Sequence, residues 1–188
     1  GTYGNVVDIV NVTGPQTGSQ GSTLPDYTCP GAYQGVRYLH MAEDPHNLTP
    51  DVIIAWVTGL NDGDTVTAEY YGYDITDGGS PSHRIWGGYT DGIDPNNYIS
   101  SAGGPTGYTA GTGWAPTSHT WTYAGGAGNG LQIQARLYST PSTSDPDHTD
   151  YWIDYVCLTV PTNACVHFPQ GGTPVENESW SCIKALYR

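Results

Sequence analysis

The apolar segments of this chain are short, rich in β-branched and aromatic residues, and bounded by turn-forming residues. Of 188 residues, 26 are Gly and 14 are Pro, so the chain is interrupted too often for long helices. Segments of this kind are typical of β-strands. The expected strands are Tyr33–His40, Val52–Thr58, Thr65–Tyr73, His83–Tyr89, His119–Tyr123, Leu131–Tyr138, Asp150–Val160 and Val166–Phe168.

So many short strands predict an all-β protein, an antiparallel β-sandwich of the jelly-roll or immunoglobulin-like type. The turn sequence Asn61-Asp62-Gly63-Asp64 predicts a hairpin between two of these strands, because Asp-Gly supplies positive φ angles. A second hairpin is expected across Gly125–Gly130. The Gly-, Pro- and Asn-rich segment Thr90–Pro116 is expected to form long loops with at most one short strand. Trp180–Tyr187 is the one segment that also fits a short helix.

Alternation along Leu131–Tyr138 assigns Gln132, Gln134 and Arg136 to the solvated side of that strand. The opposite residues of the segment are apolar and are expected to face the core.

The first 25 residues differ from the rest and predict an extended N-terminal strand arm. Asn5–Thr13 is the most β-branched stretch, and its apolar residues are Val6, Val7, Ile9, Val10 and Val12. Gly14–Pro25 has the Gly, Ser, Gln and Pro composition of a linker. We therefore divide the chain into an arm with its linker, residues 1–25, and a sandwich body, residues 26–188.

Charge excludes several classes of partner. The chain has 18 acidic and 5 basic residues, a formal net charge of −13, which argues against nucleic acid and anionic lipid as partners.

No apolar run is long enough to cross a bilayer. No basic segment followed by an apolar stretch is present, so we expect any signal peptide to have been removed. The composition, with its four cysteines, predicts an extracellular or cell-surface location.

The four cysteines predict two disulfides and no free thiol, and they lack the C-x2-C spacing of a zinc site. Three pairings are possible for Cys29, Cys157, Cys165 and Cys182. We favour Cys165–Cys182, which closes a Gly- and Pro-containing loop, and therefore Cys29–Cys157.

The acidic loop before Asp150–Val160 is the best candidate for a metal site. Asp145, Asp147 and Asp150 supply three carboxylates, the ligands that Ca²⁺ prefers. Asp74, Asp77, Asp91 and Asp94 have a weaker claim, since Asp in such contexts is usually a turn former. The residues from His40 to His46 include two His and two acids, but a solvated loop explains them better. No cofactor other than calcium is expected.

No pattern predicts catalysis. The glutamates are few, the aspartates are in turn contexts, and no G-x-S-x-G sequence is present. Three Asn-x-Ser/Thr acceptor patterns for glycosylation begin at Asn11, Asn47 and Asn177. We expect no enzymatic activity.

The six tryptophans suggest a second kind of partner, because exposed aromatic faces stack on sugar rings. Trp56 and Trp152 lie in apolar strands and are expected in the core. Trp86 and Trp114 are flanked by Gly, Ala or Pro and are better candidates for a sugar-binding surface.

In organisation the chain resembles the subunits of pili and related fibres that assemble by donor-strand exchange. The resemblance rests on the Asn5–Thr13 strand, the Gly14–Pro25 tether and the disulfide-linked all-β body, and on no residue motif. It implies a homopolymer in which the N-terminal strand, through Val6, Val7, Ile9, Val10 and Val12, completes the sandwich of a neighbouring copy. The alternative is a secreted carbohydrate-binding module that binds glycans and whose arm folds back into its own domain.

Overall fold

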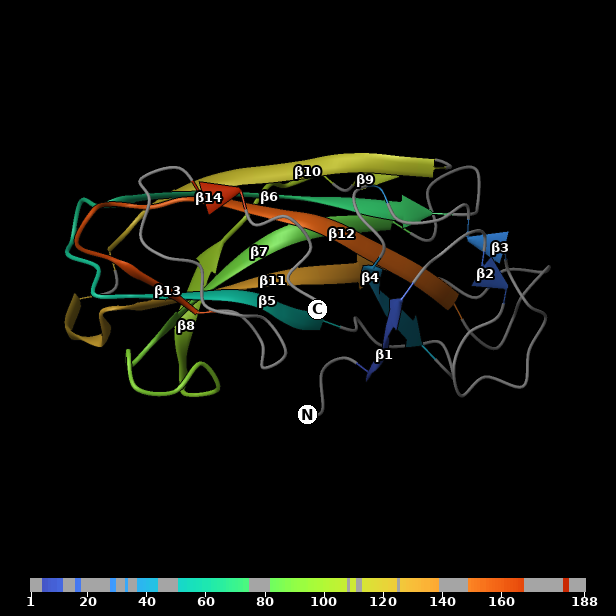
Figure 1. The fold of residues 1–188 in the computed structure, drawn as a ribbon. Coiled ribbons are helices and arrows are strands. Elements are labelled where there is room, and N and C mark those ends of the chain that lie inside the picture. Colours follow the sequence, from blue (N-terminus) through green and yellow to red (C-terminus); the bar gives the residue numbers. More distant parts are fainter. Residues whose placement is uncertain are drawn as a thin grey trace.

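We describe the chain from a computed structural model (Figure 1), which describes residues 5–11, 16–17, 28–29, 33, 37–43, 51–74, 82–107, 109–110, 113–124, 126–138, 149–167 and 181–182. The first sheet has the strand order β1-β4-β12-β6-β10, with β14 beside β12. The second has the order β13-β5-β11-β7-β8, with β9 beside β7. The elements are β1 (Asn5–Asn11), β2 (Gln16–Thr17), β3 (Thr28–Cys29), β4 (Arg37–Glu43), β5 (Asp51–Thr58), β6 (Thr65–Asp74), β7 (Ser82–Thr90), β8 (Tyr98–Gly103), β9 (Thr109–Ala110), β10 (Gly113–Thr122), a 3-10 turn η1 (Gly126–Gly128), β11 (Gly130–Tyr138), β12 (Thr149–Thr159), β13 (Cys165–His167) and β14 (Ser181–Cys182).

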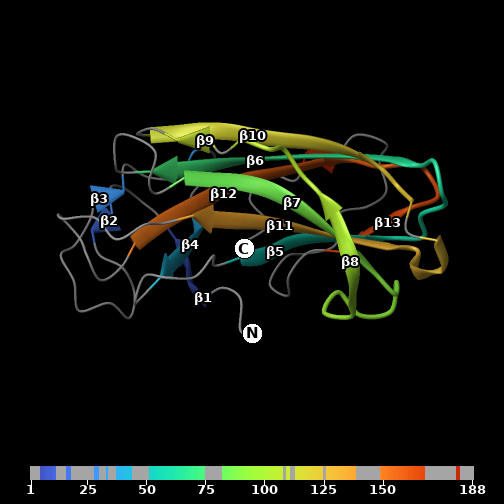
Figure 2. The same cartoon turned by 180° about the vertical axis from the view of Figure 1, so that it is seen from behind.

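The two sheets form the layers of an antiparallel sandwich, which confirms the predicted fold class. Figure 1 shows β10, β6 and β12 along the upper layer and β5, β11 and β13 along the lower one. Figure 2 shows the same layers from behind, with β8 at the edge next to β7. Their inner faces enclose one apolar core. It contains Ile54, Ala55, Val57, Leu60, Val66, Ala68, Tyr70, Ile85, Trp121, Tyr123, Leu131, Ile133, Ala135, Tyr151, Ile153, Leu158 and Ala164.

Both predicted hairpins are wrong, although the local turns are formed. The amide of Asp64 donates to the carbonyl of Asn61 over 3.0 Å, and Gly63 has a φ of +94°. This turn connects β5 of the second sheet to β6 of the first. The 3-10 turn η1 likewise connects β10 of the first sheet to β11 of the second. Turn chemistry fixed the reversals, but long-range pairing decided the neighbours of each strand.

The segment predicted as loops contains more strand than expected. β8, β9 and the first four residues of β10 all fall within Thr90–Pro116. These strands are rich in serine, threonine and glycine, so the sequence shows no alternation of apolar and polar residues from which they could be predicted. They are strands because they pair at the ends of the two ladders, β8 and β9 with β7, and β10 with β6.

The N-terminal strand pairs within its own chain. β1 is antiparallel to β4, with Asn5 opposite Ala42 and Asn11 opposite Arg37. Donor-strand exchange would instead place this strand in a neighbouring copy. The side chains of Val6, Val7, Ile9 and Val10, and all of Val12, lie outside the described parts of the chain.

The predicted bond between Cys165 and Cys182 is wrong. Cys165 is an exposed free thiol at the start of β13 in the second sheet, whereas Cys182 belongs to β14 in the first. Packed sheets are about 10 Å apart, which exceeds the roughly 7 Å that a disulfide spans between Cα atoms. Cys157 is disulfide-bonded and lies opposite Cys182 in the β12–β14 ladder. The side chains of Cys29 and Cys182 are not among those described.

Candidate functional site: the outer face of the second sheet

The outer face of the second sheet presents aromatic and amide side chains in register. The Cα pairing runs from His167 through Trp56, Gln132 and Gly88 to Ser101, across five strands. The next outward row contains Ile53, Gln134 and Trp86, and the row beyond it Asp51, Arg136 and Arg84. We call Trp56, Arg84, Trp86, Tyr98, Gln132, Gln134, Arg136 and His167 together the Trp56–Trp86 face.

Hydrogen bonds fix both indole rings of this face. Trp56 Nε1 donates to Thr90 Oγ1 over 2.9 Å, and Trp86 Nε1 donates to Ser101 Oγ over 3.0 Å. The ring of His167 lies 4.8 Å from that of Trp56. Because Trp56 points outward and is half-buried, its predicted place in the core is wrong. Trp86 is half-buried as well.

The Tyr98 ring lies beside the backbone of Gly88. A Cβ at Gly88 would be 3.0 Å from the ring of Tyr98 and 2.6 Å from Gln132 Nε2. The absence of a side chain at this position therefore lets an aromatic ring and an amide meet on the sheet surface. Tyr98 is 51% exposed, whereas Trp56 and Trp86 are half-buried.

The two glutamines of β11 point outward, yet they are buried. Gln132 is 3% exposed and Gln134 is 6% exposed. Sequence alternation assigned them correctly to the outer side, but their predicted solvation is wrong. The side chains around them account for this, and Gln134 Oε1 accepts a hydrogen bond from Arg136 Nε over 3.0 Å. Two polar amides are thus held in a nearly dry aromatic setting.

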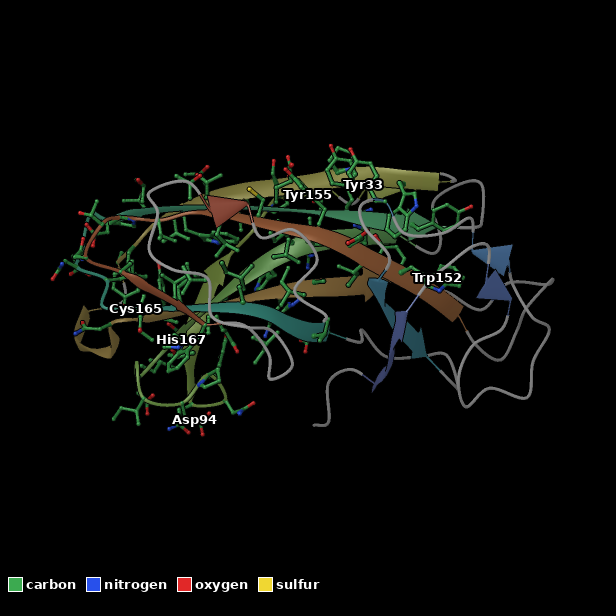
Figure 3. All side chains as sticks on the ribbon, viewed as in Figure 1. Tyr33, Asp94, Trp152, Tyr155, Cys165 and His167 are labelled. Atoms are coloured by element: carbon green, nitrogen blue, oxygen red, sulfur yellow. The ribbon has the colours of Figure 1, made fainter. Side chains whose placement is uncertain are left out.

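Trp114 belongs to a second aromatic group, on the outer face of the first sheet. The rings of Tyr33 and Tyr71 stack at 3.9 Å with an interplanar angle of 15°, and Tyr155 meets both edge-on. We call Tyr33, Tyr71 and Tyr155 the tyrosine cluster; Trp114 lies 6.2 Å from Tyr33. A hydrogen bond with Tyr33 raises the pKa of Tyr71 to about 12. Figure 3 shows Tyr33 and Tyr155 above the upper layer, and Cys165 and His167 at the lower one.

The rings of the tyrosine cluster contact one another more closely than the two indole rings of the Trp56–Trp86 face do. Tyr33 and Tyr71 stack and Tyr155 meets both edge-on, whereas Trp56 and Trp86 are separated by the amides of Gln132 and Gln134. Trp152 also faces outward on this side, but it is only 1% exposed. The first sheet therefore uses its outer rings mainly to pack against each other.

The acidic turn before β8 has the structural role that its sequence predicts. Asp91 Oδ1 accepts the amides of Ile93 and Asp94 over 2.8 and 3.0 Å, and Asp91 Oδ2 accepts Asn97 Nδ2. These hydrogen bonds lower the pKa of Asp91. Asp94 Oδ1 caps the amide of Asn96 in the same way, over 2.8 Å. Both carboxylates act as turn formers.

Several predicted sites cannot be placed. Asp145, Asp147, Asn47 and Asn177 lie outside the described residues, as does the side chain of Asp150, and Asn11 ends β1. Within the described ranges, no three His, Cys, Asp or Glu side chains come together as a metal site would require. In the same ranges no helix is long and apolar enough to span a membrane.

Comparison with known proteins gives structural matches only. No family model matches the chain, and no curated protein matches it in sequence. The chain is similar in structure to the CBM22-1 xylan-binding domain from Paenibacillus barcinonensis Xyn10C, at 16% identity and a TM-score of 0.43, over 84% of this chain and 96% of that one. The CBM22-2 domain of the same protein gives 14% identity and a TM-score of 0.43, over 84% and 94%. Similarity this low leaves the function to be argued from the site itself.

Proposed function

We propose that this chain is a secreted, non-catalytic carbohydrate-binding module that holds a polysaccharide on the Trp56–Trp86 face. The observation that carries the proposal is the alternation of aromatic rings and amides on one sheet surface. Sugar rings present apolar C–H faces, which stack on aromatic rings, and hydroxyl groups, which exchange hydrogen bonds with amides. Gln132 and Gln134 lie between Trp56 and Trp86, and the small exposed edges of their amides are the parts that can meet a sugar hydroxyl.

Fixed geometry favours binding at this face. The hydrogen bonds from the indoles of Trp56 and Trp86 hold the rings before any ligand arrives, so little side-chain freedom is lost on association. The glutamines are already buried, so their position is set by packing. This preorganisation distinguishes the face from a set of scattered surface aromatics.

Alanine substitution at the two indoles tests the proposal. Trp56→Ala and Trp86→Ala should each weaken polysaccharide binding by about 10- to 100-fold, the loss expected for a central aromatic contact. Binding is measured by affinity electrophoresis in gels containing xylan, β-glucan, mannan or pectin, followed by calorimetry on the best polymer. Circular dichroism confirms that each variant is folded.

Trp114→Ala is the matched control, because it removes the same side chain from the opposite side of the sandwich. Its binding should equal that of the unmodified chain. The reverse result, with binding lost in Trp114→Ala and kept in Trp56→Ala and Trp86→Ala, would move the site to the tyrosine cluster. Absence of binding to every polymer would refute the proposed function.

A further inference from the structure

The rings of Tyr33 and Tyr71, on the outer face of the first sheet, are stacked unusually closely. Their centres lie 3.9 Å apart and their planes differ by 15°. Aromatic pairs in proteins usually have ring centres about 4.5–7 Å apart, in offset or edge-to-face arrangements. A separation of 3.9 Å between nearly parallel rings leaves little room for an offset. The two phenol rings therefore lie almost directly over one another.

The hydroxyl groups of these two rings are also close. The side chains of Tyr33 and Tyr71 share a hydrogen bond, which is the largest of the causes that raise the pKa of Tyr71. Since the hydroxyl is the single polar group of a tyrosine side chain, this hydrogen bond joins the two hydroxyl groups. The rings are thus stacked head to head, and the ring carbons next to the hydroxyl groups face each other across the stack.

The backbone brings a third tyrosine to the same place. Tyr155 meets the rings of Tyr33 and Tyr71 edge-on, with 5.9 and 5.7 Å between ring centres. It lies at an irregularity in the β12–β6 ladder, and its φ is +53°, a left-handed value that is uncommon for a residue with a side chain. Bulges of this kind re-aim side chains. Figure 3 shows Tyr33 and Tyr155 together above the upper layer, where Tyr155 supports the stack from one side.

We propose that the tyrosine cluster is a site of oxidative cross-linking, in which Tyr33 and Tyr71 are joined as dityrosine. The oxidant is hydrogen peroxide, used by a haem peroxidase. Each phenol loses one hydrogen atom, that is one electron and one proton, and the peroxide is reduced to two molecules of water. The two phenoxyl radicals form a carbon–carbon bond between the positions next to their hydroxyl groups. The hydrogen displaced from each of these carbons returns to the phenol oxygen of its ring.

Exposure and proximity favour this bond over coupling between two molecules. Tyr33 is 40% exposed, so an oxidant can reach its ring. The Tyr71 ring is already in contact with it, and two reacting groups held together react far faster than the same groups in dilute solution. Tyr98 is more exposed, at 51%, but its ring lies over Gly88 instead of a second tyrosine. We therefore expect the Tyr33–Tyr71 pair to react before Tyr98 does.

Peroxidase treatment of the folded chain tests the proposal. Cys165 is first capped with iodoacetamide, because its exposed thiol would also react with the oxidant. After addition of peroxide and peroxidase, the blue fluorescence of dityrosine should appear in the monomer band of a denaturing gel. The intact mass should fall by two hydrogen atoms, and peptide mapping should join Tyr33 to Tyr71. The same treatment in concentrated urea should give about 10-fold less of this product, because the two rings are then apart.

Phenylalanine variants locate the bond. Tyr33→Phe and Tyr71→Phe keep an aromatic ring in the stack but lack the phenol, so each should lower the yield of dityrosine in the monomer by about 10-fold or more. Tyr73→Phe makes the same exchange two residues further along β6 and should leave the yield unchanged. Circular dichroism confirms that each variant is folded.

Several results would overturn the proposal. Absence of dityrosine from the treated folded chain is one, and cross-links that form only between molecules are another. A peptide map that joins other tyrosines, or a normal yield in Tyr33→Phe, would show that the stacked pair is not the site. The tyrosine cluster and the Trp56–Trp86 face belong to different sheets, so these results leave the proposed polysaccharide binding untouched.

Discussion

Gly72→Ala should destabilise the sandwich severely. A Cβ at Gly72 would overlap the hydroxyl of Tyr151 and come within 2.8 Å of His83 Cε1. Tyr151 is 1% exposed and His83 is 1% exposed, so neither ring has room to move aside. Overpacking of a closed core costs about 3 kcal/mol or more when the overlap is this large. We expect the melting temperature to fall by roughly 6–12 °C, measured by circular dichroism.

Gly107→Ala is the control, because no atom lies within 4 Å of the added Cβ and the position is exposed. Its stability should be nearly unchanged. Shortening the opposing side chain in the double variant Gly72→Ala/Tyr151→Leu should cost less than the two single changes added together. A Gly72→Ala protein as stable as Gly107→Ala would contradict the packing between β6, β7 and β12.

Stability should decline in mild acid because of one buried histidine. Burial lowers the pKa of His83 to about 3, and its Nδ1 lies 3.1 Å from the hydroxyl of Tyr70. An unfolded histidine has a pKa of about 6.5, so the folded state resists protonation. The resulting stability is complete above pH 6.5 and is lost progressively as the pH falls toward 3. The total loss from this group is about 5 kcal/mol, with about 2 kcal/mol already lost at pH 5.

Urea unfolding at a series of pH values from 7 to 4 measures this effect. His83→Gln should be less stable at pH 7, but its free energy of unfolding should change less between pH 6.5 and 4.5. His167→Gln makes the same exchange at an exposed histidine and measures the effect of the exchange itself. The same slope in His83→Gln and in the unmodified chain would show that other groups govern the acid limb.

The sequence predicts the position of a strand well where its residues have strong β-propensity. Val52–Thr58, a continuous run of mostly β-branched apolar residues, and Thr65–Tyr73, in which apolar and polar residues alternate, correspond closely to β5 and β6. The sequence does not predict which strands pair with one another. The turn at Asn61–Asp64 is the one expected, yet β5 pairs with β11 and β13 while β6 pairs with β10 and β12. A local turn fixes a reversal of the chain, and the contacts that choose partners come from distant segments.

The candidate site was only partly visible in the sequence. Trp86 was a candidate because Gly87 and Gly88 follow it. Tyr98 was missed, since it lies in a segment dominated by Gly, Pro and Asn, although Tyr98-Ile99 has the β-propensity of a strand. Trp56 was assigned to the core because apolar residues surround it. Trp56 faces outward opposite Gln132 and His167, because it alternates with the core residues Ala55 and Val57.

The order of the strands also determines when the body can fold during synthesis. Among the described strands that follow one another directly in the chain, only β7 and β8 are paired in the two large sheets. The strand between β4 and β6 is β12, which ends at Thr159, and the strand between β5 and β7 is β11. A nascent chain therefore carries the flanking strands of both sheets before either central strand has emerged. Such non-local pairing is slow and leaves strand edges exposed while it is incomplete. Until residues near 159 have been synthesised, the negative charge of the chain and its many turns oppose aggregation of the unfinished chain through these edges.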